Sequence, residues 1–238
     1  MVDGTGEGLS GEARFGPRSG SGSQLRWQVV LRRVAGAVFV LWALGLVQTL
    51  IPFQANGERV WVLDPDQEIG ILTWVSILGH FAAAILLFLN GQAAMDLGKP
   101  KASLWFVLAM LFVALSFDEF YGLHERFSVH FREQIDGTGL LFFAWALPAG
   151  LLSLAGLILL MPFLQSLGRR TSSLMIASAL LFLSGAVGVE MISGSVMEEA
   201  GLNGQGYRLL TSLEEGLELS GILLFIHALF DHRDRTPR

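Results

Sequence analysis

The stretch SLWFVLAMLFVALSFDEFYGLHE, residues 103–125, decides the fold of this 238-residue chain. It begins with an apolar run close to the roughly 20 residues that an α-helix needs to cross a bilayer. Backbone groups in lipid must be satisfied within the segment, and the run lacks the alternation of barrel strands, so it predicts a helix. That helix ends in three carboxylates and a histidine, residue types that are rare in contact with lipid.

Five more apolar runs of similar length occur along the chain, and 52% of all residues are hydrophobic. This composition is typical of membrane proteins. The Gly- and Ser-rich residues 1–24 are predicted to be a disordered tail, and residues 25–238 a transmembrane domain. We predict an all-α, polytopic membrane protein with a bundle of six transmembrane helices, at about 34–53, 69–90, 103–123, 140–163, 173–193 and 209–230.

Lys and Arg residues divide unevenly between the two sets of predicted loops. Cytoplasmic loops accumulate these residues, so both termini are predicted to be cytoplasmic. The basic residues of the cytoplasmic side are Arg26, Arg32, Arg33, Lys99, Lys101, Arg169, Arg170, Arg233, Arg235 and Arg238. Those of the outer side are Arg59, Arg126, Arg132 and Arg208, which lie among many acidic residues.

Missing residue types and motifs narrow the chemistry. The chain has no cysteine, which excludes disulfides, thiolate metal sites and cysteine nucleophiles. It has no Walker loop, no GxSxG elbow, no HExxH motif and no ExxH pair of the ferritin-like di-iron kind. The net charge of −5 and the lack of a basic face indicate no nucleic-acid partner.

Acidic residues of three predicted spans gather at one depth. The third and fifth spans end on the outer side, and the sixth begins there, with its three glutamates about 9 to 15 Å along the axis at 1.5 Å per residue. The residues of this layer are Asp118, Glu119, His124, Glu125, Glu190, Glu214, Glu215 and Glu218. His80, in the second span, lies deeper.

Helical spacing groups some of these side chains. Asp118 and Glu125 are seven residues apart and nearly in line on a helix, and Glu214 and Glu218 share a face. Glu119 and His124 are predicted to point away from the Asp118 stripe, unless a kink at the intervening glycine changes this.

Seven carboxylates in this layer exceed the three nearby arginines, Arg126, Arg132 and Arg208. Either several acids remain protonated, or divalent cations hold them together. For the second case we predict metal ligands among Asp118, His124, Glu125, Glu190, Glu214, Glu218 and His80, with Fe, Mn or Zn as the metal. Catalytic roles are predicted for Asp118, Glu125 and Glu218.

The segments FDEFYGLHE, GVEMISG and LEEGLELSGILLF together resemble a group of bacterial multi-span membrane proteins of unknown function. These proteins share Asp-Glu, His-Glu and Glu-Glu-x-x-Glu elements, and the resemblance covers most of the third to sixth predicted spans. It implies a common intramembrane site and a place in the bacterial inner membrane, but no particular chemistry.

Three functional classes remain open. The first is a metal-dependent membrane hydrolase or oxidase that acts on a lipid-like substrate, since membrane lipids can reach the site laterally. The second is a proton- or cation-coupled transporter that uses the same acids. The third is an assembly subunit that buries them against a partner protein, whose identity the sequence leaves unknown.

Overall fold

The computed structural model describes residues 20–50, 60–67 and 69–236, with side chains described from residue 26 onward except that of Glu133. Within these ranges every regular element is helical, which confirms the all-α prediction. The elements are α1 (Gly20–Leu50), η1 (Trp61–Leu63), α2 (Ile71–Asp96), α3 (Ser103–Tyr121), α4 (Leu123–Ile135), η2 (Gly139–Leu141), α5 (Ala146–Ser166), α6 (Arg169–Leu183), η3 (Ser184–Val189), α7 (Glu190–Ala200) and α8 (Gln205–Arg235).

Five helical runs are long and apolar enough to cross a membrane: Arg26–Leu50, Ile71–Asp96, Ser103–Tyr121, Ala146–Ser166 and Arg169–Ala200. The last of these combines α6, η3 and α7. The sixth predicted span corresponds to α8, which is a 31-residue helix but does not meet the same criterion of composition. Its glutamates and the charges near its end make it more polar than the other five runs.

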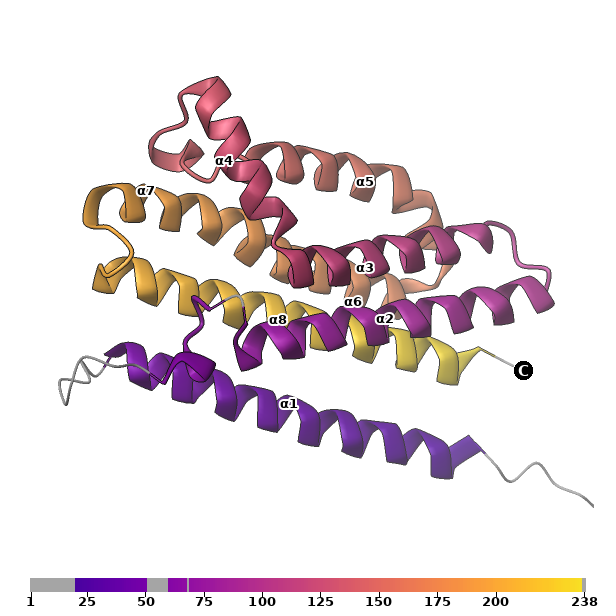
Figure 1. Ribbon diagram of the computed structural model, residues 1–238. Coiled ribbons are helices and arrows are strands. Elements are labelled where there is room, and N and C mark those ends of the chain that lie inside the picture. Colours follow the sequence, from indigo (N-terminus) through magenta and orange to yellow (C-terminus); the bar gives the residue numbers. More distant parts are fainter. Residues whose placement is uncertain (1–19, 51–59, 68, 237–238) are drawn as a thin grey trace, which may run out of the picture.

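The long helices lie roughly side by side, with α8 between α1, α2 and the α6–α7 run (Figure 1). α2 and α3 form an antiparallel pair, and α5 packs on α6 at the side away from α1. The main core lies between these helices and includes Leu87, Trp105, Phe163 and Leu229, all nearly inaccessible. α8 therefore contributes to the interior of the bundle, which is where polar residues of a membrane protein are expected.

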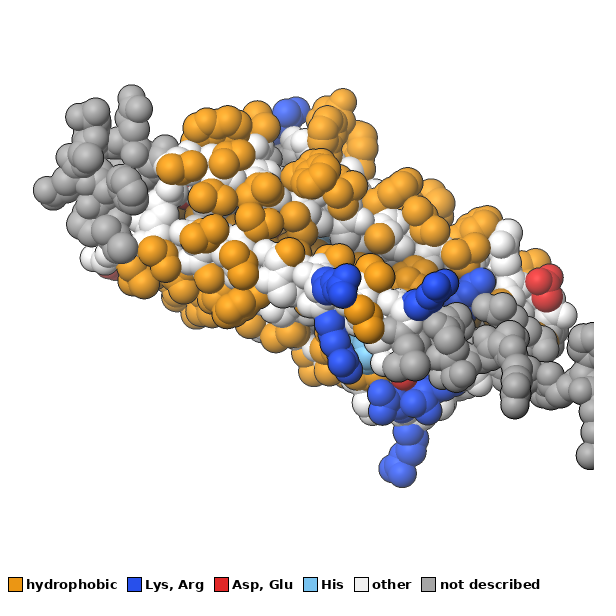
Figure 2. Space-filling view, turned by 90° about the horizontal axis from the view of Figure 1, so that it is seen from below, with side chains coloured by type: hydrophobic (Ala, Val, Ile, Leu, Met, Phe, Trp, Pro, Cys, Tyr) orange, Lys and Arg blue, Asp and Glu red, His pale blue; other side chains and the backbone are white. Residues whose placement is uncertain are grey.

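Hydrophobic side chains cover much of the face shown in Figure 2, as a lipid-facing surface requires. Most Lys and Arg side chains in that view gather on one half of the face. The start of α1, the α2–α3 turn, the α5–α6 turn and the end of α8 all lie at this end of the bundle, and they carry the basic residues predicted for the cytoplasmic side.

Several predicted boundaries shift in the structure. α1 begins at Gly20, inside the segment predicted as a disordered tail, and residues 1–19 lie outside the described ranges. α1 ends at Leu50, and the predicted continuation to residue 53 also lies outside them. The fourth span begins at Ala146 rather than near residue 140, because a short 3-10 turn, η2, precedes it.

Two local breaks interrupt helices beside the acidic layer. Gly122 has φ 57° and ψ 44°, a left-handed conformation that glycine adopts without strain, and it ends α3 so that α4 leaves in a new direction. In the α6–α7 run the six residues of η3 form a π-helix, an irregularity that often occurs at functional sites.

Candidate carboxylate cavity

A cavity of about 450 Å³ lies between the α3–α4 segment, the α6–α7 run, α2, α5 and α8. We call it the carboxylate cavity. Every acidic residue of the predicted layer lines it: Asp118, Glu119, Glu125, Glu190, Glu214, Glu215 and Glu218. His80 and His124 also line it, as does Asp66 from the loop before α2.

Asp118 and His124 form an ion pair across the break at Gly122. The His124 Nδ1 atom lies 2.9 Å from Asp118 Oδ2, and the His124 backbone N–H donates to Asp118 Oδ1 at 3.0 Å. Asp118 thus caps the start of α4 as well as pairing with the imidazole. Two expectations from a continuous helix are therefore wrong, since His124 turns toward Asp118 and the Asp118–Glu125 stripe is broken at Gly122.

The ion pair makes His124 a cation at neutral pH. Burial lowers the pKa of His124, but the hydrogen bond to Asp118 and the charges of Asp118, Glu119 and Glu190 outweigh burial and raise this pKa from 6.5 to about 9. The imidazolium also lies beside the Trp145 indole, with ring centroids 4.8 Å apart. His124 therefore supplies one positive charge to a cavity that is otherwise lined by acids.

Glu190, the first residue of α7, is held by an aromatic donor. Its Oε1 atom accepts a hydrogen bond from the Trp145 indole N–H at 3.0 Å. Glu214 and Glu218 of α8 line the same cavity, so carboxyl groups of two helices face one space. Like charges at such a site disfavour ionisation of every group, which favours bound protons or a bound cation.

η3 brings the α6–α7 run close to the glutamates of α8. A Cβ atom added at Gly185 would lie 2.8 Å from the Glu214 carbonyl oxygen and 3.0 Å from Glu218 Cγ. Glycine thus permits the close approach that places Glu190 against Glu214.

α2 contributes polar groups to the deeper wall. The Glu119 carboxyl group hydrogen-bonds to Ser76. His80, only 1% exposed, directs Nδ1 to the Ser76 carbonyl oxygen at 3.1 Å. Since a carbonyl oxygen only accepts, Nδ1 carries the hydrogen and Nε2 remains an acceptor.

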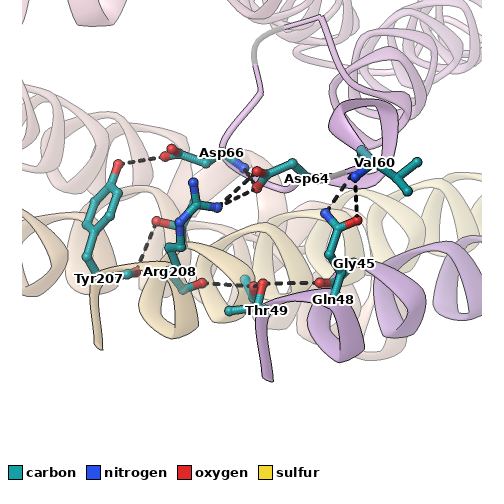
Figure 3. Close-up of polar contacts among 10 residues, drawn as sticks. Gly45, Gln48, Thr49, Val60, Asp64, Asp66, Tyr207 and Arg208 are labelled. Atoms are coloured by element: carbon teal, nitrogen blue, oxygen red, sulfur yellow. Dashed lines mark hydrogen bonds and ion pairs between the residues drawn. The ribbon is translucent and has the colours of Figure 1, made fainter. Parts of the chain in front are cut away.

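The outer arginines serve other partners. Arg208 donates to both oxygens of Asp64 at 3.1 and 2.9 Å, and neighbouring Tyr207 donates to Asp66 at 2.7 Å (Figure 3). Arg132 lies over the Phe142 ring at 4.5 Å, and Arg126 is exposed. The charge of Arg208 is therefore committed to Asp64 rather than to the acidic layer.

The predicted metal-binding and catalytic roles remain predictions. Among the residues that the structure describes, no three His, Asp or Glu side chains are grouped closely enough to hold a metal ion. Binding by Asp118 and His124 would require their ion pair to open. The predicted ligands left without that constraint are Glu125, Glu190, Glu214, Glu218 and His80.

Sequence reasoning did not assign three residues of the site. These are Trp145, Asp66 and Tyr207, which all line the cavity and to which no sequence pattern gave a role. The relevant signal is weak in each case. An indole N–H or a phenol next to acidic residues is a donor, but its partner depends on how distant segments pack.

The sequence of residues 31–233 matches a family model described as "Domain of unknown function (DUF8692)". Neither a curated protein nor a solved structure matches the chain significantly. The match extends over all the helices that line the carboxylate cavity.

Proposed function

This chain belongs to the DUF8692 family, and we propose that it is a proton-coupled membrane carrier whose carboxylate cavity binds a cationic ligand. The observation that carries this proposal is the cavity itself, which is lined by seven carboxyl groups of the predicted layer, whereas the only cation in its described ion pairs is His124. Acids gathered in this way favour bound protons or bound cations. When a ligand with one positive charge enters and one proton leaves these acids, the charge of the cavity is unchanged. Exchange of this kind couples the two movements.

The helix breaks support the same function. Carriers commonly form ligand sites where transmembrane helices are discontinuous, since exposed backbone and mobile ends accompany such breaks. Here the left-handed Gly122 directly follows the turn that holds Asp118, and η3 directly precedes Glu190. Both breaks therefore adjoin acidic residues of the cavity.

Six membrane crossings are part of this proposal. α8 is 31 residues long and lies among the five apolar runs, so it would cross with them and keep its glutamates inside the bundle. With the basic end of the bundle in the cytoplasm, both termini are cytoplasmic and the carboxylate cavity opens toward the outer side. The resemblance noted above favours a bacterial inner membrane with lipids as neighbours.

Proton flux in liposomes tests the carrier function. Purified protein is reconstituted with a pH gradient, and a pH-sensitive dye is followed after addition of Na⁺, K⁺, Ca²⁺ or dodecyltrimethylammonium. We expect at least one cation to dissipate the gradient faster than in protein-free liposomes, and Glu214→Gln to abolish the difference. Glu199→Gln, on an exposed residue near the end of α7 outside the cavity, is the matched control and should behave like the wild type. No effect of any cation, or full activity of Glu214→Gln, would refute this function.

A metal-dependent membrane enzyme is the second candidate, because the His80 Nε2 acceptor lies on the same cavity as Glu190, Glu214 and Glu218. Imidazole and carboxylate ligands suit Fe, Mn or Zn, but the side chains would have to move together to bind one ion. Metal analysis of the purified wild type and Glu218→Ala tests this. Stoichiometric metal in the wild type that is lost in the variant would favour the enzyme, and a metal-free wild type would end this alternative.

A further inference from the structure

We infer that the ligand of the carboxylate cavity is an amphiphile with a cationic amine head and a hydrocarbon tail, and that it enters from the lipid between α3 and α5. This inference rests on the proposed binding of a cationic ligand and specifies its class. The inference depends on a second cavity, which the acidic residues do not line.

The second cavity is apolar and has a volume of about 470 Å³. It lies between α3, α5, α6 and α8, with walls that include Leu108, Phe112, Leu157, Leu160 and Ile222. Each of the two cavities has a volume within the range of small-molecule sites, roughly 300 to 1,000 Å³. The lining of the apolar cavity suits a hydrocarbon chain and offers no partner to a second charged group.

The two cavities meet at a common wall. His80, Leu115, Ser153, Phe182 and Leu183 line both of them. One continuous ligand can therefore place a polar group among the carboxyl groups and an apolar group between the helices. The boundary between acid-lined and apolar walls also fixes which end of the ligand goes where.

His80 gives the junction an acceptor. Its side chain is 1% exposed, and its Nδ1 hydrogen is used by the Ser76 carbonyl, so the lone pair is on Nε2. Because His80 lines both cavities, a primary ammonium group at the junction would donate to Nε2 while its charge faces the carboxylates.

The apolar cavity is open on the side of the lipid. α3 packs on α2, whereas α5 packs on α6, so these two helices lie on opposite sides of the opening. Leu111 on α3 is 49% exposed and Leu152 on α5 is 76% exposed, and both line this cavity. A tail can thus move from the bilayer into the cavity without crossing water.

Charge excludes the common alternative of an anionic lipid head. Seven carboxyl groups and Asp66 line the polar cavity, and His124 already pairs with Asp118. A phosphate or carboxylate head would add negative charge to this set at close range, which is unfavourable in a poorly hydrated site. A cationic head reduces the excess instead.

Binding of radiolabelled dodecylamine to nanodisc-embedded protein tests the inference, with empty phosphatidylcholine nanodiscs subtracted. Propylamine has the same head without the tail, and dodecanoate has the tail with an anionic head. We expect saturable binding of dodecylamine and at least tenfold weaker binding of dodecanoate. Equal affinity for dodecanoate would overturn the cationic head.

A matched pair of glycine variants separates tail binding from simple partition into lipid. Gly156 lines the apolar cavity, and no atom lies within 4 Å of the point that a Cβ would occupy there, so the first atom of a larger side chain has room and we expect the ring of Gly156→Phe to take up part of the cavity. Gly36 on α1 is equally unobstructed but lines neither cavity, so Gly36→Phe is the control. Gly156→Phe should weaken dodecylamine at least tenfold and leave propylamine within twofold, while Gly36→Phe changes neither.

The outcomes distinguish this inference from the carrier function. If Gly156→Phe binds dodecylamine like the wild type, or if short cations drive proton flux as well as long ones, the amphiphile inference fails and the carrier stands. If dodecylamine binding is lost in Gly156→Phe but no cation drives proton flux, the carrier fails and the amphiphile site stands.

Discussion

Two polar regions lie within three helical turns of each other on α8, and they differ in how their charges are balanced. At the start of the helix Arg208 and Asp64, 9% and 5% exposed, form a two-pronged ion pair, and Tyr207 donates to Asp66 (Figure 3). Further along, Glu214 and Glu218 face other acids, and the only cation in a described ion pair of that cavity is His124.

The comparison separates structural polarity from functional polarity. A buried charge with a matched partner holds segments together, and here it fixes the loop before α2 to the start of α8. A group of like charges without matched partners does not stabilise a fold, so its presence calls for a proton or a ligand. The first region should therefore respond to mutation through stability and the second through function.

The largest expected effect is the loss of the matched pair. Arg208→Leu leaves the Asp64 carboxylate buried without its guanidinium, so we expect a loss of about 3 to 5 kcal/mol in the free energy of unfolding. Unfolding in mixed micelles of mild and denaturing detergent measures it. The exposed Arg126→Leu is the control and should change stability by less than about 0.5 kcal/mol.

A double variant sharpens this prediction. Arg208→Leu combined with Asp64→Leu removes both charges, and we expect it to recover at least half of the loss caused by Arg208→Leu alone. Additive losses in the double variant would show that the pair is not the source of the effect.

The next effect concerns pH, at the ion pair that Asp118 and His124 form in the cavity. Because the folded pKa of His124 is raised from 6.5 to about 9, its contribution to stability is complete below pH 6.5 and is lost as the pH rises through about 9. One pKa unit corresponds to about 1.4 kcal/mol, so the loss is about 2 to 3 kcal/mol after allowance for partial exposure. Unfolding measured from pH 6 to 10 should show this slope. Asp118→Asn should flatten it, and an unchanged slope in that variant would contradict the assignment.

A smaller effect is expected where η3 touches α8. Gly185→Ala places a methyl group 2.8 Å from the Glu214 carbonyl oxygen, so we expect η3 to shift and stability to fall by about 1 to 2 kcal/mol. Gly188→Ala, in the same η3, has open space at that position and should not destabilise the protein. Equal losses in both variants would point to the helix geometry rather than to contact with α8.

The smallest effect on stability is expected inside the cavity. Glu214→Gln keeps the size and polarity of the side chain while it removes an acid from a crowded set, so the free energy of unfolding should change by less than about 1 kcal/mol. The same detergent titration measures this, beside the flux assay in which the variant is expected to be inactive. A loss as large as that of Arg208→Leu would place Glu214 among the structural residues instead.

Particular residues show how far sequence reasoning reached. The apolar runs predicted helices, because satisfying the backbone in lipid leaves few alternatives. Counting residues along the predicted spans put Asp118, Glu190 and Glu214 at one depth, and in the structure all three line one cavity. The direction of His124 was wrong, because a left-handed Gly122 rotates everything after it, and helical angles hold only for an unbroken helix.

The sequence did not predict which side chains of distant segments contact each other. Arg208 had several acids within plausible reach, and its choice of Asp64 depends on how the loop of residues 60–67 folds onto α8. The Glu190–Glu214 contact likewise needs η3, whose extra residue per turn changes the face that α7 presents. The hydropathy pattern also predicted α8 as a span. Its glutamates, which line the cavity, place it outside the five clearly apolar runs.

The sequence by itself determined the helical class, the approximate position of each helix along the chain and the gathering of acids at one level. These follow from backbone hydrogen bonding in lipid and from the fixed rise per residue, both of which are local. Only the tertiary structure decided which charges are paired, which acids line one cavity and that an apolar cavity adjoins the acidic one. Those depend on distances of a few ångströms between residues far apart in the chain, which local periodicity does not set.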